Sequence, residues 1–84
     1  MSADHVVVEV LAQLLDVDED LLTSETELVE IEGWDSVNSL RILVFLEREL
    51  GTPVDFEAFS AAVVIGDLFA VADRALGLPQ GSPG

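Results

Sequence analysis

Apolar residues recur with the period of an α-helix in three separate stretches of this 84-residue chain. The stretches run from Val6 to Leu15, over residues 36–50, and from Leu68 to Leu76. Residues 17–35 show no such period and are rich in acidic and polar side chains. Because the apolar period of these stretches is that of a helix, we predict an all-α fold. So short a chain supports only one core. The expected form is a small four-helix bundle, with three main helices plus a short third helix, and a long loop between helices one and two.

We expect helices over residues 3–16, 36–50, 56–60 and 66–76. Ser2 or Asp4 would cap the first helix and Asp35 the second, which Gly51 would end. The start of the last helix has no capping hydroxyl, because Val63 and Val64 precede it.

The long loop should be held over the helices by its isolated apolar side chains. These are Leu21, Leu22, Leu28, Val29, Ile31 and Trp34. We expect one domain over residues 1–78, followed by a flexible C-terminal tail over residues 79–84, which are mostly Gly, Pro, Ser and Gln.

Acidic residues dominate the charge of the chain. Seventeen acids face three arginines, Arg41, Arg48 and Arg74, for a net charge of −14. Such a chain repels nucleic acid and anionic membranes, and is steered towards basic protein surfaces. Alternatively, the acids only keep an apolar small domain soluble. No apolar run exceeds five residues, so we expect no membrane span, and we expect a cytoplasmic monomer.

Catalysis and metal binding both lack a motif. The chain has no Cys, and its one histidine, His5, has no evident nucleophile to serve, so we predict no catalytic residue. Residues 16–27 place oxygen-bearing side chains at several positions of a calcium-binding EF-hand loop. Leu21 stands where the sharp turn of that loop needs Gly, so we interpret the match as chance and predict no metal site.

The helix expected over residues 36–50 has two apolar faces. A helical wheel groups Ser39, Ile42, Leu43, Leu46 and Leu50 as the core stripe. On nearly the opposite side lie Val37, Leu40 and Val44, bordered by Arg41, Glu47 and Arg48. This second stripe either packs under the long loop or remains exposed as a docking patch for other proteins.

Residues 35–47, Asp-Ser-Val-Asn-Ser-Leu-Arg-Ile-Leu-Val-Phe-Leu-Glu, resemble the signature of the acyl and peptidyl carrier protein family. The preceding Gly33-Trp34 is similar to the approach seen in discrete carriers of specialised biosynthesis. Pro53-Val54 and residues 65–68 resemble the segments before the third and fourth helices of that family. The resemblance extends from Val6 to Leu76 without an obvious insertion.

The resemblance implies that Ser36 holds a covalent phosphopantetheine arm. A separate phosphopantetheinyl transferase would attach the arm from coenzyme A, and its thiol would then carry cargo as a thioester. A helix N-terminus suits this role, because its free N–H groups and dipole favour a phosphate. The plain alternative is that Ser36 only caps the helix. Ser39 should face the core, and Ser24 and Ser60 follow no Asp.

The implied function is a non-catalytic carrier. Its partners would be the transferase, an acyl- or aminoacyl-activating ligase or adenylation enzyme, and downstream synthase, condensation or transferase enzymes. Carriers of fatty-acid synthesis usually have an acid where Arg41 stands, so we expect a dedicated carrier of a polyketide, nonribosomal-peptide or lipopeptide pathway, or one that carries an amino acid. The expected partner-docking residues are Trp34, Asp35, Val37, Leu40, Arg41, Val44, Glu47 and Arg48. The alternative function is a cofactor-free acidic interaction module that docks through Val37, Leu40 and Val44.

Overall fold

Four α-helices and two short 3₁₀ turns make up the computed structural model, which describes residues 3–77. Their bounds, in chain order, are α1 Asp4–Leu15, η1 Glu19–Leu21, η2 Leu28–Glu30, α2 Ser36–Leu50, α3 Phe56–Ser60 and α4 Ile65–Ala75. The predicted all-α bundle with a short third helix is confirmed. The end of the predicted domain at Leu78 and the predicted tail over residues 79–84 lie outside the described residues.

The bounds of α2 and α3 agree with the sequence prediction, because carboxylates mark where each helix begins. Asp35 accepts a hydrogen bond from the Asn38 backbone N–H at 2.7 Å, as a helix N-cap should. At the other end of α2, Gly51 adopts φ 72°, a left-handed conformation that glycine accepts without strain. Asp55 caps α3 through the N–H groups of Glu57 and Ala58.

The start of α1 differs from the prediction. Asp4 is already the first helical residue, and no side chain caps Ala3, which precedes it. Ser2, the other expected cap, lies outside the described residues. The backbone N–H of Ala3 instead donates to Asp73 Oδ1 on α4 at 2.8 Å. A contact between distant parts of the chain therefore replaces the expected local cap.

The predicted weakness at the start of α4 is resolved by Asp67. Val64 occupies the cap position and has no polar side-chain atom. Asp67, three residues further on, turns back so that its Oδ2 accepts the N–H groups of Val63 and Val64, at 2.9 and 3.2 Å. This is the acidic half of a capping box, and it lowers the pKa of Asp67 below its ordinary 3.8, first through Val63 and then through Val64.

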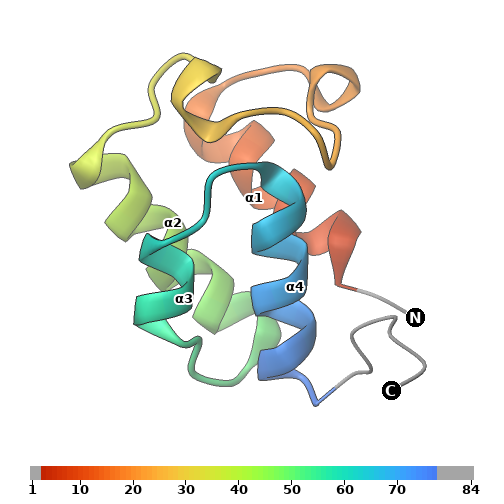
Figure 1. Ribbon diagram of the computed structural model, residues 1–84, viewed down its shortest axis with the longest axis vertical. Coiled ribbons are helices and arrows are strands. Elements are labelled where there is room, and N and C mark those ends of the chain that lie inside the picture. Colours follow the sequence, from red (N-terminus) through yellow and green to blue (C-terminus); the bar gives the residue numbers. More distant parts are fainter. Residues whose placement is uncertain (1–2, 78–84) are drawn as a thin grey trace.

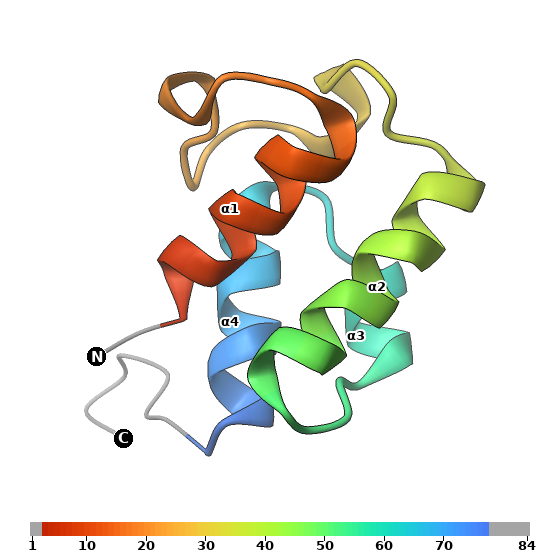
Figure 2. The same ribbon diagram turned by 180° about the vertical axis from the view of Figure 1, so that it is seen from behind.

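The core lies where α1 packs against α2 and α4, with α3 closing one side (Figures 1 and 2). Its most completely buried large side chains come from all three main helices and from the long loop. They are Val7, Leu11, Leu28, Ile42, Leu46, Ile65 and Leu68. The predicted core stripe of α2 is confirmed for Ile42, Leu43 and Leu46, whereas Leu50 at its end is half-buried.

The long loop arches over one end of the bundle, as Figure 1 shows in orange and yellow. Leu22, Leu28 and Ile31 anchor it in the core as predicted, but Leu21 and Val29 are exposed. Backbone hydrogen bonds also join it to the segment before α4. They run from Leu28 N to Val63 O, from Ile65 N to Thr26 O and from Gly66 N to Ser24 O, at 2.8–2.9 Å. The loop is therefore an ordered layer of the fold.

Within residues 3–77, every helix is too short or too polar to cross a lipid bilayer.

Candidate functional site: the N-terminus of helix α2

Ser36 is the first residue of α2, and its side chain is exposed. Asp35 occupies the cap position and supplies the capping carboxylate, so the interpretation of Ser36 as an ordinary helix cap is wrong. The Ser36 hydroxyl is therefore not needed to cap the helix. The start of α2 stands at a corner of the bundle, where the long loop meets the helix (Figure 2).

Hydrogen bonds of Asn38 fix the backbone that leads into Ser36. Its backbone N–H binds Asp35, and its Nδ2 donates to the carbonyl of Gly33 at 2.7 Å. Gly33 adopts φ +91°, which L side chains rarely accept, so a glycine is required there. Sequence reasoning did not single out Asn38. The available signal in the sequence was an amide side chain three residues after the predicted cap, Asp35, from where it can bond back to the preceding loop.

The backbone at the start of α2 favours an added phosphate on Ser36, although the neighbouring Asp35 carboxylate opposes it and already accepts the Asn38 N–H. The first N–H groups of a helix have no partner within the helical ladder, and they give this end of α2 partial positive charge. An anion bound to Ser36 would meet these donors.

An open hollow of about 310 Å³ begins at Ser36 and lies between α2 and α3. Its lining is mostly apolar, with serine hydroxyls at Ser36, Ser39 and Ser60 and side chains of Leu40, Phe56 and Phe59. Ser39, expected to face the core, is half-buried, and its hydroxyl donates to the Ser36 carbonyl at 3.0 Å. Phe56, which sequence reasoning missed, is 54% exposed.

The second apolar stripe of α2 is uncovered. Val37, Leu40 and Val44 are 67%, 51% and 52% exposed, so the interpretation that the long loop packs over them is wrong. Arg41 and Arg48 are exposed on the same helix. The structure thus places five of the expected docking residues on one surface that starts beside Ser36.

Two expected docking residues point elsewhere. Trp34 is half-buried against the core, and its ring lies 6.2 Å from that of Phe59, so it anchors the loop as the plainer interpretation held. Glu47 is half-buried, and its Oε2 accepts the backbone N–H of Val54 at 2.9 Å. Both side chains hold neighbouring segments against α2.

The family model for the phosphopantetheine attachment site matches residues 5–71, which is most of the chain. The chain belongs to the acyl and peptidyl carrier protein family. It is also similar to an acyl carrier protein of Thermotoga maritima, with 28% identity over 71 residues that cover 84% of this chain and 88% of the relative.

Members of this carrier family are not enzymes. They bear a covalent phosphopantetheine group and serve partner enzymes, including a phosphopantetheinyl transferase and enzymes that handle acyl groups. In the part of the chain that the structure describes, no group of three or more acidic, His or Cys side chains gathers in a way that would hold a metal ion.

Proposed function

We propose that Ser36 Oγ carries the phosphopantetheine arm, and that this chain is a carrier of a polyketide, nonribosomal-peptide or lipopeptide pathway. The observation that carries the proposal is an exposed serine at the first position of a firmly capped helix, beside an open hollow. The residues present fit the group, because a transferase can approach the hydroxyl from solvent and the helix N-terminus receives the phosphate.

The arm, once bound, supplies the thiol on which cargo is held as a thioester. This chain's own residues supply position and access. Asp35 and Asn38 hold the start of α2 in one conformation, so that Oγ projects from a rigid element rather than from a loop. Leu40 and Phe56 line an apolar part of the hollow that would accommodate the arm. Because the transfer consumes coenzyme A, we place the modification in the cytoplasm.

The exposed stripe of α2 serves as the docking surface for partner enzymes in this proposal. Val37, Leu40 and Val44 form its apolar part, and Asp35, Arg41 and Arg48 lie at its ends and edges. Trp34 and Glu47 contribute from behind by fixing the adjoining loop segments. The partners are the transferase, an activating ligase or adenylation enzyme, and the enzymes that remove or extend the cargo.

The assignment to a specialised pathway rests on Arg41 and Arg48. A partner patch made for an acidic carrier helix carries basic residues, and these would face like charges here. A dedicated set of partner enzymes avoids that repulsion. Cargo identity is set by the enzyme that loads the carrier.

The test is mass spectrometry of the intact protein after incubation with coenzyme A, Mg²⁺ and a broad-specificity phosphopantetheinyl transferase. We expect one phosphopantetheinyl increment on the wild-type chain and none on Ser36→Ala. Ser39→Ala and Ser60→Ala are matched controls, because both hydroxyls line the same hollow, and both variants should gain the full increment. A folded wild-type chain without an increment, or an increment retained by Ser36→Ala, would contradict the assignment; the first result would favour the cofactor-free interaction module.

A further inference from the structure

Two of the three basic residues of the chain lie on one exposed line along α2. Val37, Arg41, Val44 and Arg48 follow one another at steps of four, three and four residues, which places them along one face of a helix. Leu40 borders this line and is half exposed. We call these five residues the α2 stripe.

The two acidic residues of α2 are Glu47, which borders the α2 stripe beside Val44, and Glu49, which lies off it. Glu47 is engaged with the backbone of Val54. Glu49 lines a separate hollow that faces α1, together with Glu9 and Gln13. In a chain with a net charge of −14, the α2 stripe itself therefore carries only positive formal charges, set among apolar side chains.

Both arginines keep hydrogen-bonding capacity for a partner. Arg41 makes a single long contact, from Nη1 to Asn38 Oδ1 at 3.5 Å. The Arg48 guanidinium carbon lies 5.7 Å from the centre of the Phe45 ring, a cation–π contact that engages no hydrogen-bond acceptor. A planar guanidinium with a free edge is suited to paired hydrogen bonds with a carboxylate.

We propose that the α2 stripe docks onto a partner protein whose own patch has an apolar centre flanked by carboxylates, one facing Arg41 and one facing Arg48. The two arginines are seven residues apart, which sets the spacing of these carboxylates at about 10 Å along the helix. Basic residues at the same places would bring like charges together and be rejected. The inference rests on the proposed carrier function for its purpose, because the α2 stripe begins beside Ser36.

An anionic membrane shares the chemistry of negative charge above an apolar layer, but it fits this chain poorly. The chain as a whole carries seventeen acidic residues against three arginines, and a continuous negative surface would repel these acids over about one Debye length. A protein patch places its carboxylates only where the arginines stand. Charge complementarity therefore favours a protein partner.

The experiment uses two synthetic helical peptides with the same apolar face, one edged with glutamates and the other with lysines. Each is titrated into the ¹⁵N-labelled chain at about 0.15 M salt, where long-range repulsion is screened beyond about 8 Å. We expect the glutamate peptide to shift the amide signals of residues 37–48. Arg41→Glu and Arg48→Glu should each weaken this binding about fivefold or more.

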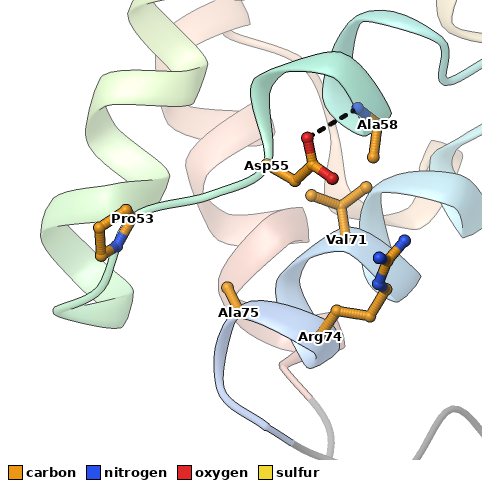
Figure 3. A pocket seen from close by; sticks show the side chains of 6 residues that line it. All are labelled: Pro53, Asp55, Ala58, Val71, Arg74 and Ala75. Carbon is orange, nitrogen blue, oxygen red and sulfur yellow. Dashed lines mark hydrogen bonds between the residues drawn. The ribbon is translucent and has the colours of Figure 1, made fainter.

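Arg74→Glu is the matched control. It makes the same change in net charge, but Arg74 lies on α4 beside a hollow lined by Pro53, Asp55 and Ala58, away from the α2 stripe (Figure 3). The affinity of Arg74→Glu for the glutamate peptide should change less than twofold. Arg41→Gln, which removes the charge without adding an acid, should give an intermediate loss, and the thermal midpoint of every variant should stay near that of the wild type because the arginines are exposed.

Three results would overturn the inference. They are a larger shift of residues 37–48 with the lysine peptide, an equal loss in Arg74→Glu, and shifts of these residues with phosphatidylserine vesicles but not with the glutamate peptide. The peptide assay is independent of the arm, so Ser36→Ala should bind as the wild type does. A chain that gains the arm at Ser36 and ignores the glutamate peptide keeps the proposed carrier function and loses only this inference.

Discussion

Two aspartates, Asp35 and Asp67, stabilise the starts of α2 and α4, and they do so in different ways. Asp35 stands at the cap position of α2 and bonds forward to Asn38. Asp67 stands inside α4 and bonds back to Val63 and Val64. A polar residue just before a helix is recognised from sequence, so Asp35 was predicted. Asp67 could equally have been one of the many exposed acids, so only the structure shows that its side chain bonds back to the start of α4.

Loss of the Asp67 carboxylate should destabilise the fold at neutral pH. We expect Asp67→Ala to lower the free energy of unfolding by about 0.5–1 kcal/mol, the usual worth of an exposed helix cap. Because the hydrogen bonds depress the folded-state pKa below 3.8, this contribution is present above 3.8 and disappears as the pH falls through the lower, folded-state value.

Urea unfolding of the wild type and of Asp67→Ala across this pH range measures the effect. The difference between the two proteins should shrink well below pH 3.8. Asp67→Asn serves as the control, since it keeps an acceptor oxygen and should lose less stability at neutral pH. A difference that stays constant down to the acid limb would contradict the assigned role of the carboxylate.

At the scale of elements, the helices were predictable and the fit between the long loop and the bundle was not. The limits of α2 and α3 depend on nearby residues, and the sequence analysis placed both correctly. The loop instead pairs with a segment far along the chain, as in the bridge between Glu27 and Val64. A single bridge is too short to show the alternation of apolar and polar residues that predicts a strand, so this pairing could not be predicted from the local sequence. The exposure of the α2 stripe also depended on where this loop came to rest.

Gly66 permits the close approach of the long loop to α4. A Cβ atom at this position would lie 2.9 Å from the backbone oxygen of Ser24, which also accepts the Gly66 N–H. Gly66→Ala should gain up to about 1 kcal/mol of helix propensity but lose about 1–3 kcal/mol to this overlap. We therefore expect a net loss of stability by urea unfolding, with faster amide exchange at Leu28 and Ile65.

Gly51→Ala is the informative comparison for Gly66→Ala. An added Cβ at Gly51 meets no atom within 4 Å, so this variant suffers only from its left-handed φ of 72°. Gly51→Ala should lose stability, but the amides of Leu28 and Ile65 should not exchange selectively faster. If both variants changed the exchange of these amides equally, the overlap at Gly66 would not be the cause.

For the whole molecule, the excess of acidic residues affects behaviour in solution more than it affects the fold. Half of the residues are apolar and supply the core, while seventeen acids crowd the surface against three arginines. This excess was evident from composition, and the acid-rich loop was evident from the sequence. Only the structure reveals that the α2 stripe, which contains two of the three arginines, is exposed to solvent.

Self-repulsion of the acids should make the stability depend on salt. We expect the thermal midpoint to rise by several degrees when NaCl increases from about 0.02 M to about 0.3 M, because screening weakens repulsion in the folded chain. Circular dichroism at the two concentrations measures this. A variant with Glu19→Gln, Asp20→Asn and Glu25→Gln, all exposed in the long loop, should respond less. A midpoint indifferent to NaCl would argue against repulsion as a limit on stability.

The hydrogen bond from Ala3 to Asp73 has a consequence for how the molecule can be tethered. It draws the beginning of α1 to the end of α4, and Figures 1 and 2 place that junction at the opposite end of the bundle from the start of α2. A bead, a fluorescent protein or a neighbouring domain attached on that side would leave Ser36 pointing outwards. In the proposed carrier role, a tether at that junction would therefore leave the modified end of the bundle accessible to partner enzymes.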